Sequence, residues 1–238
     1  MWLPLAWTSG VIRLWATAIL IESELMAGCS RGAAPLRNPN DARSIAAWAV
    51  HHEGADLPMP TLCPPPLVHT ERLVLRRPVP GDAQAIFERY AQDPETVRYM
   101  TWRPHNSIAD TREFLGRVDE SWSNGSDFSY VMCLAGEDAP FGMIGIHPAG
   151  FKANFGYVIA RPFWGKSYTA EALTVLADWV LTQEGIWRAA AWCDVDNPAS
   201  ARVMEKAGMT FEGVLRRWSL HPNVASEPRD CLSYAKVR

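Results

Sequence analysis

Apolar and polar side chains alternate regularly only after a long irregular N-terminal stretch. Leu73 and Leu75 are separated by a single residue and flanked by arginines, which predicts a strand with one buried face. Apolar positions recur at helical spacing over residues 108–122 and, more strongly, over residues 168–183. The pattern therefore predicts an ordered domain over residues 68–238.

The remaining segments complete an element order of βααβββαβαββ. Short turn-forming connections between the middle strands fit an antiparallel meander. The expected fold is therefore a mixed α/β (α+β) domain with a central, mostly antiparallel sheet and four helices. The expected helices cover about residues 82–91, 108–122, 168–183 and 198–207, and the expected strands about residues 70–77, 128–135, 141–147, 154–160, 188–193, 211–217 and 230–237.

Residues 1–58 do not follow this pattern. Their apolar, Trp-rich start is interrupted by Arg13, and its uncharged run is shorter than the ~20 residues that span a bilayer. It also lacks the basic segment that precedes the apolar core of a secretory signal. We expect either a poorly ordered extension or a start-site artefact, with translation beginning at Met59, followed by a Pro-rich linker at residues 59–67. A membrane tether is the remaining alternative for this segment.

Composition and charge narrow the class of function. A net charge of −3 argues against a nucleic-acid partner, which requires a basic face. The five cysteines are widely spaced and form no C-x-x-C pair, so neither a metal site nor a disulfide framework is expected. These features are typical of a cytoplasmic protein with reduced thiols and no firm membrane association.

Residues 159–172 form the first segment with candidate chemistry. A strand ends, a short loop containing Gly165 follows, and a helix begins with small residues. Backbone N–H groups at such a helix start converge on one point, where the helix dipole favours a phosphate. Gly165 permits close approach of a ligand and Lys166 adds positive charge. On its own this junction is more often a structural turn than an anion site.

A second segment, residues 194–211, predicts a capped helix between two strands. Asn197 is a good N-cap, Pro198 suits the first helical position, and Gly208 suits the C-terminal end. Helix capping alone is enough to explain why Asn197, Pro198 and Gly208 occur at these positions. It does not explain why Asn197 and Ser200 occur together at the end of a sheet that already carries a candidate anion site, where both side chains can face a thioester.

Taken in this order, the two segments resemble the GNAT superfamily of N-acetyltransferases, and in particular its branch of ribosomal-protein N-terminal acetyltransferases (the RimJ/RimL type). The matching residues are Thr70-Glu71-Arg72-Leu73-Val74-Leu75-Arg76, Trp164-Gly165-Lys166, Tyr168, Glu171-Ala172, Asn197, Ser200 and Glu205-Lys206-Ala207-Gly208. The resemblance implies acetyl-CoA as co-substrate and no metal. It also implies a twisted sheet with a V-shaped splay between the strands that end near Ala160 and Cys193.

The resemblance further implies which residues hold acetyl-CoA. Pantetheine lies in the splay and binds the backbone at Val158 and Ile159, and a backbone N–H at Val158 or a neighbour stabilises the oxyanion. Asn197 contacts the cofactor arm. Ser200 and Asn197 are the catalytic candidates, with Ser200 donating to the CoA sulfur. The diphosphate binds at the turn formed by Trp164, Gly165, Lys166, Ser167, Tyr168, Thr169 and Ala170.

Several positions depart from the superfamily pattern. The three defining positions of its pyrophosphate motif are occupied by Trp164, Ser167 and Thr169, and the two hydroxyl residues either crowd the phosphates or donate to them. Met204 stands where many relatives have a tyrosine general acid, and a thioether cannot donate that proton. Asn154 stands where a glutamate base is common. The general base is left open among His147, Glu171 and Asp194.

The expected reaction is direct attack of a primary amine on acetyl-CoA, without an acyl-enzyme. The acceptor is a small molecule or a protein N-terminus, and the branch resemblance favours a peptide or small primary amine. Trp102 and His105 are either the wall of the acceptor site or part of an ordinary polar loop. A catalytically impaired acyl-CoA sensor, favoured by Asn154, Ser167 and Met204, is the alternative. A homodimer is one possible assembly.

Overall fold

The computed structural model describes residues 61–238. The predictions for residues 1–60, which include the N-terminal extension, the start at Met59 and the beginning of the linker, lie outside the described residues. In the described part, no helix is long and apolar enough to cross a membrane. Leu62 is buried in the apolar core, and the Pro65 carbonyl accepts a hydrogen bond from the Tyr130 hydroxyl (2.7 Å). The packing of the domain therefore extends back to residue 62.

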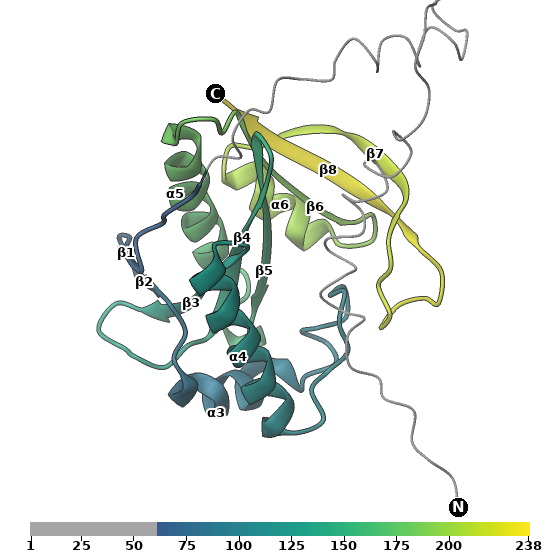
Figure 1. Ribbon diagram of the computed structural model, residues 1–238. Coiled ribbons are helices and arrows are strands. Elements are labelled where there is room, and N and C mark those ends of the chain that lie inside the picture. The colour runs from purple at the N-terminus through teal and green to yellow at the C-terminus, as the bar shows by residue number, and fades with distance from the viewer. Residues whose placement is uncertain (1–60) are drawn as a thin grey trace, which may run out of the picture. The chain divides into compact units, whose positions relative to one another are not determined.

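One eight-stranded sheet organises residues 61–238, in the order β1-β2-β3-β4-β5-β6-β8-β7 (Figure 1). Neighbouring strands are antiparallel except β5 and β6, which are parallel. The mostly antiparallel sheet predicted from the sequence is confirmed. The strands are β1 (Leu67–His69), β2 (Leu73–Arg76), β3 (Phe128–Leu134), β4 (Gly142–Ala149), β5 (Lys152–Ile159), β6 (Arg188–Asp194), β7 (Thr210–Ser219) and β8 (Arg229–Val237).

The first predicted strand differs from the structure, which has a hairpin of two short strands there. The N–H of Thr70 donates to the carbonyl of Leu73 (2.9 Å) and closes the turn between β1 and β2. Leu73 and Leu75 are fully buried, as their alternation predicts. The extra strand was not predicted because three residues of β1 are too few to show a period of two.

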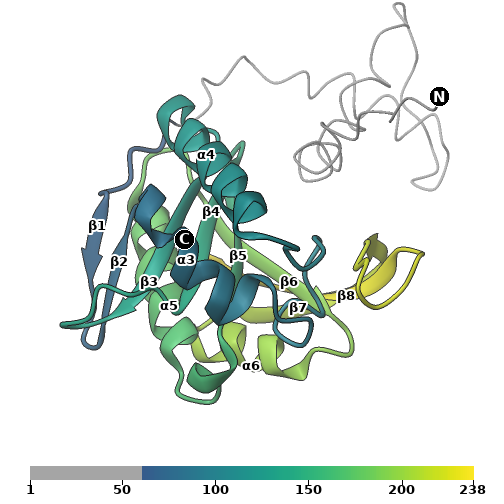
Figure 2. The same ribbon diagram turned by 90° about the horizontal axis from the view of Figure 1, so that it is seen from below.

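Helices cover both faces of the sheet (Figure 2). They are α3 (Ala83–Ile86), which continues as a π-helical turn (Phe87–Ala91), α4 (Ile108–Asn124), α5 (Tyr168–Thr182) and α6 (Pro198–Lys206). Successive residues of β3 belong to different apolar clusters: Tyr130 packs in the cluster of α5 and α6, and Val131 packs in the cluster of α3 and α4. Because successive strand residues point to opposite faces, the two helix pairs lie on opposite sides of the sheet.

The pairing between β5 and β6 stops half-way along the strands. It extends only from Lys152 opposite Arg188 to Phe155 opposite Ala191. β5 then remains paired with β4 as far as Ile159, and β6 remains paired with β8 as far as Asp194. The two strands therefore diverge toward their C-terminal ends, which is the V-shaped splay that the family resemblance implied.

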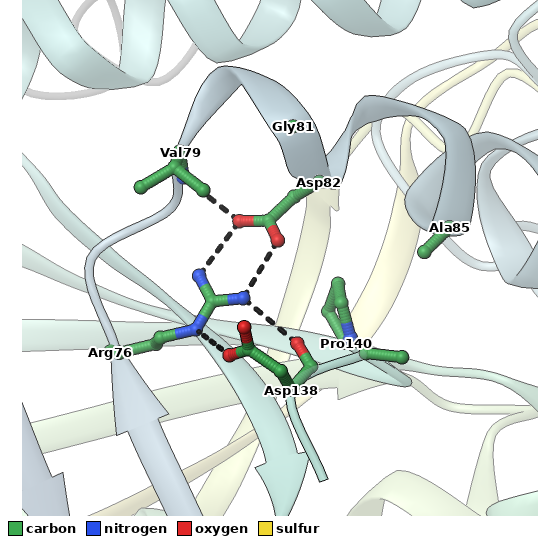
Figure 3. Close-up of a pocket in the computed structure, with 8 residues that line it drawn as sticks. Arg76, Val79, Gly81, Asp82, Ala85, Asp138 and Pro140 are labelled. Atoms are coloured by element: carbon green, nitrogen blue, oxygen red, sulfur yellow. Dashed lines mark hydrogen bonds and ion pairs between the residues drawn. The ribbon is translucent and has the colours of Figure 1, made fainter.

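An arginine fork fastens the start of α3 to two other parts of the domain (Figure 3). Arg76 on β2 donates to both carboxylate oxygens of Asp82 (2.8 and 2.7 Å) and to the carbonyl of Asp138 (2.9 Å) in the β3–β4 turn. Asp82 also accepts from the N–H of Val79 (2.8 Å) and is only 5% exposed. The ion pair raises the pKa of Arg76. This network fixes α3 and the chain that follows it against the sheet.

We predict that Asp82→Ala lowers the free energy of unfolding by about 3 kcal/mol, because the largely covered Arg76 guanidinium loses its bidentate partner. Urea unfolding measures this loss. Glu227→Ala is the matched control, because it removes the partner of Arg217 from an exposed pair and should cost at most about 0.5 kcal/mol. Equal losses in the two variants would contradict a structural role for the Arg76 fork.

Candidate active site

β5 directs a particular set of backbone groups into the splay. The N–H of Ala160 donates to the carbonyl of Phe141 (2.9 Å), on the β4 side. Bonded and non-bonded pairs alternate along an antiparallel ladder, so Val158 also directs its N–H and C=O to β4. Tyr157 and Ile159 direct theirs to the opposite side, where β6 has diverged. The backbone groups of Tyr157 and Ile159 therefore face the splay.

This register changes one expected backbone contact. The N–H of Val158 points to β4, so it cannot make the cofactor contact that was expected there. The neighbouring N–H that faces the splay is that of Tyr157. Ile159 does face the splay, but its carbonyl accepts a hydrogen bond from the indole Nε1 of Trp164 (2.7 Å). The Trp164 ring is 45% exposed and caps the end of β5. The N–H groups of Tyr157 and Ile159 are thus the backbone donors nearest the splay.

The N-terminal end of α5 follows immediately after the splay. Its first intrahelical hydrogen bond runs from the N–H of Glu171 to the carbonyl of Ser167 (3.1 Å). The N–H groups of Tyr168, Thr169 and Ala170 precede this bond and have no acceptor within the helix. The expected diphosphate turn therefore has the geometry of a helix-start anion site.

Ser167 occupies a backbone conformation that favours glycine. Its φ of 62° lies in the left-handed region, as does that of Gly165 at 76°. Ser167 stands where the superfamily motif has glycine, and the positive φ gives the physical reason for that preference. Of the two hydroxyl residues at this turn, Thr169 is buried, and the Ser167 hydroxyl accepts from Nζ of Lys206 (2.8 Å).

Three cationic side chains surround this turn. Lys206, at the C-terminal end of α6, reaches Ser167 as described, and Lys166 lies over the Phe163 ring with Nζ 5.3 Å from its centroid. Arg72 of the β1–β2 turn donates to the Lys166 carbonyl (3.1 Å) and lies over the Tyr168 ring. Lys206 and Arg72 were not predicted as site residues, because nothing in their sequence spacing links them to the turn. Arg72 is paired with Glu171, so the net positive charge beside the turn comes from Lys166 and Lys206, and it favours an anionic ligand.

The N-terminal end of α6 faces the splay from the opposite side. Asn197 is its N-cap, and Oδ1 of Asn197 accepts from the N–H of Ser200 (3.2 Å). The Ser200 hydroxyl lies 2.8 Å from the hydroxyl of Tyr157, which extends from β5. Met204 is fully buried in the core and offers no proton. Ser200 and Tyr157 are therefore the hydroxyl groups that the structure brings together here.

The cysteines of this region are poor nucleophiles. Burial raises the pKa of Cys193 to about 11 and that of Cys231 to about 12, so both thiols remain protonated at neutral pH. Cys193 lies next to Asn197, whose carbonyl accepts from its Sγ at 3.6 Å. Among residues 61–238 no cluster of three metal-ligating side chains occurs.

Two of the three candidate bases are held in ion pairs. The Glu171 carboxylate accepts from the hydroxyl of Thr70 (2.5 Å) and from Nε of Arg72 (2.7 Å); these bonds outweigh the opposing effect of burial and lower its pKa. Asp194 is fully buried and is bound by Arg229 at 2.5 and 2.9 Å, and its pKa is likewise lowered. Both groups are better explained as structural carboxylates than as bases.

His147 lies beside the position where a glutamate was expected. It is opposite Asn154 in the β4–β5 register, so their side chains share one face of the sheet. Nδ1 of His147 contacts the Asp127 carboxylate, which orients the ring. The ring lies over Gly145, where a β-carbon would come within 2.9 Å of it. Gly145 pairs with Gly156, so two glycines leave the sheet surface beside His147 without side chains.

The predicted acceptor residues lie on that same face of the sheet. Trp102 and His105 are half-buried, with ring centroids 5.2 Å apart, and Trp102 packs in the cluster of α3 and α4. His105 bonds Thr111 through Nδ1 (2.7 Å), and burial lowers its pKa. The β7–β8 connection holds the loop that contains Trp102, because Nδ2 of Asn223 donates to the Trp102 carbonyl (2.7 Å). The hydroxyl of Tyr99 donates to the Asp196 carbonyl (2.9 Å). Hydrogen bonds to two other parts of the domain therefore hold this segment in place.

Comparison with known proteins identifies the family. Residues 72–210, more than half of the chain, match the acetyltransferase (GNAT) domain. The chain belongs to the GNAT acetyltransferase family. The enzyme class and fold predicted from the sequence are thereby confirmed.

The GNAT domain resembles several further proteins. The uncharacterized N-acetyltransferase p20 of Bacillus licheniformis is 27% identical over 152 residues, which are 63% of this chain and 85% of p20. The microcin C7 self-immunity acetyltransferase MccE, solved with acetyl-CoA and AMP, has a TM-score of 0.64 at 23% identity and covers 71% of this chain and 94% of its own. The ribosomal L7/L12 acetyltransferase RimL, solved with coenzyme A, has a TM-score of 0.63 at 19% identity and covers 72% and 97%. At these identities the two structures show a shared fold.

We predict that Ser167→Gly leaves the free energy of unfolding unchanged or raises it by up to about 1 kcal/mol, because glycine adopts a positive φ without steric cost. Ser167→Val should lower it by about 2 kcal/mol, since a β-branched residue is disfavoured at that φ. Urea unfolding of both variants tests this difference. Both variants lose the hydroxyl that accepts from Lys206, so equal losses in the two would show that this contact, and not backbone strain, dominates at this position.

Proposed function

We propose that this GNAT domain binds acetyl-CoA in the splay between β5 and β6 and transfers the acetyl group to a primary amine. The observation that carries the proposal is the end of β5–β6 pairing at Phe155, which leaves the N–H groups of Tyr157 and Ile159 facing a gap. The gap leads to the N-terminal end of α5 and its three cations. A pantetheine arm followed by a diphosphate matches this sequence of groups. MccE with acetyl-CoA and RimL with CoA, which share the fold, support this choice of ligand.

The proposed chemistry is direct acyl transfer. The neutral amine attacks the thioester carbonyl and forms the C–N bond, and the N–H of Tyr157 stabilises the resulting oxyanion. The C–S bond then breaks, with Ser200 donating a hydrogen bond to the leaving sulfur. The amine proton passes to a base and a proton is returned to the thiolate, which gives the amide and free CoA. Protonated thiols at Cys193 and Cys231 favour this route over an acyl-enzyme.

His147 is our proposed base. Trp102 and Val158 pack in the apolar cluster of α3 and α4, and so does Met143 on β4. Alternate residues of a strand share a face, so Gly145 and His147, two and four residues after Met143, lie on this α3–α4 face as well. An amine entering over Gly156 would meet the His147 ring, which lies over the neighbouring Gly145. Asp127 can stabilise the imidazolium that forms.

The acceptor is proposed as a primary amine on a peptide or small molecule. Trp102 supplies a half-buried aromatic surface in a wall that Asn223 holds in place. RimL acts on a ribosomal-protein N-terminus and MccE confers immunity to microcin C7, so this shared fold serves both protein and small-molecule acceptors. The rival function, an acyl-CoA sensor without turnover, has Met204, Asn154 and strained Ser167 in its favour.

A single assay separates these functions. Release of CoA thiol from acetyl-CoA is measured with a panel of amines and N-terminal peptides, alongside thermal stabilisation by CoA. We expect turnover with at least one acceptor. Thermal stabilisation without turnover across the panel would support the sensor, and the absence of any CoA binding would refute the proposed function.

We predict that Ser200→Ala lowers kcat about tenfold while the KM for acetyl-CoA changes less than twofold, because the hydrogen bond to sulfur strengthens as the thiolate forms. The variant retains the N–H that Asn197 caps. Steady-state thiol release gives both constants. An unchanged kcat would remove Ser200 from the mechanism.

We predict that His147→Gln lowers kcat/KM for the amine about 100-fold at neutral pH, the usual contribution of one general base. Added imidazole should restore part of the activity, which a purely structural role would not allow. His69→Gln is the matched control, since His69 is exposed on the edge strand β1. Full activity of the His147 variant would exclude it as the base.

A further inference from the structure

Two hydroxyl groups meet across the splay on the α5–α6 face of the sheet. The Tyr157 hydroxyl lies 2.8 Å from Oγ of Ser200 and 3.1 Å from the carbonyl oxygen of Ser200. Tyr157 extends from β5, and Ser200 lies in the first turn of α6. This contact therefore joins the two walls of the splay at the place where the proposed thioester lies.

The phenol has one hydrogen and two nearby acceptors. In one arrangement it donates to the Ser200 carbonyl, and the serine hydroxyl can then donate back to the phenol oxygen. In the other it donates to Oγ of Ser200, and the serine hydrogen points away from Tyr157. In the first arrangement the phenol oxygen competes with a sulfur atom for the serine hydrogen, whereas in the second that hydrogen is free to bond the sulfur. The developing negative charge on that sulfur would favour it.

We propose that Tyr157 is a positioning residue, which holds Oγ of Ser200 as an acceptor and so directs the serine hydrogen to the acyl sulfur. This rests on the proposed function, in which Ser200 is the donor to the leaving thiolate. Without the phenol, the Ser200 hydroxyl can rotate toward other acceptors, because Ser200 lies in the first turn of α6 and has no preceding helical turn to hold it. Tyr157 thus supplies an orientation that α6 alone does not.

Tyr157 acts by hydrogen bonding and not as the proton donor itself. Its ring packs against the apolar core, and burial raises the pKa of its hydroxyl, so loss of its proton is disfavoured. Met204, at the position of the usual tyrosine acid, has no hydroxyl to compete for the sulfur. The Tyr157–Ser200 pair therefore brings two hydroxyl groups together at the splay, without a competing phenol at position 204.

The first test is Tyr157→Phe, which removes the hydroxyl and keeps the ring. We expect kcat to fall about fivefold, the factor typical of one neutral hydrogen bond, with the KM for acetyl-CoA changed less than twofold. Tyr130→Phe is the matched control, because Tyr130 is a buried tyrosine whose hydroxyl bonds a backbone carbonyl (2.7 Å) outside the site. It should lower the unfolding temperature by a similar amount and leave kcat unchanged. Activities are compared well below both unfolding temperatures.

The second test combines the variants. If Tyr157 acts through Ser200, Tyr157→Phe should lower kcat by less than twofold in the Ser200→Ala background. An equal loss in both backgrounds, or an unchanged kcat in the single variant, would overturn the proposal. So would a lower KM with unchanged kcat, which would make the contact a barrier to CoA entry. Each of these outcomes would overturn the role of Tyr157 without affecting the proposed acetyltransferase function. The absence of turnover in the wild-type protein would overturn both the role of Tyr157 and the proposed function.

Discussion

The end of hydrogen bonding between β5 and β6 is the constraint on which the rest of the site depends. Both strands remain paired on their outer sides, β5 with β4 and β6 with β8, so the gap opens without loss of the sheet. The alternation of an antiparallel ladder then decides which residues face the gap. Tyr157 and Ile159 present their N–H groups there because Phe155, two residues earlier, is the last to pair with β6.

α6 connects the two ends of this gap. Its N-terminal turn carries Ser200, which contacts Tyr157, and its C-terminal end carries Lys206, which contacts Ser167 in the turn before α5. A nine-residue helix is a rigid spacer, so the thioester end and the phosphate end of the proposed cofactor are held at a fixed separation. The buried side of α6, at Met204, anchors it to the core. Met204 therefore contributes to core packing, whereas a tyrosine at this position could act as a proton donor.

The sequence predicted the elements well and the contacts between them less well. Alternation at Leu73 and Leu75 and helical spacing in α4 and α5 were sufficient to place these elements, because burial of one face is a local pattern. The sequence did not show that the N–H of Val158 points to β4 and away from the splay, because the direction of an N–H depends on ladder register rather than on residue type. The contact of Tyr157 with Ser200 joins residues 43 positions apart, and no local pattern reports it. The Arg76 fork was not predicted for the same reason.

The two faces of the sheet impose different demands on side chains. On the α5–α6 face the proposed donor site consists largely of backbone N–H groups and a helix end, so serine at position 167 and methionine at position 204 leave its geometry in place. On the α3–α4 face the proposed acceptor site consists of side chains, including Trp102 and His147, on a wall that Asn223 fastens. A backbone site specifies a ligand through the fold alone, whereas a side-chain site specifies it residue by residue. If the proposed acceptor site is correct, substitutions on the α3–α4 face should change the acceptor without changing the affinity for CoA.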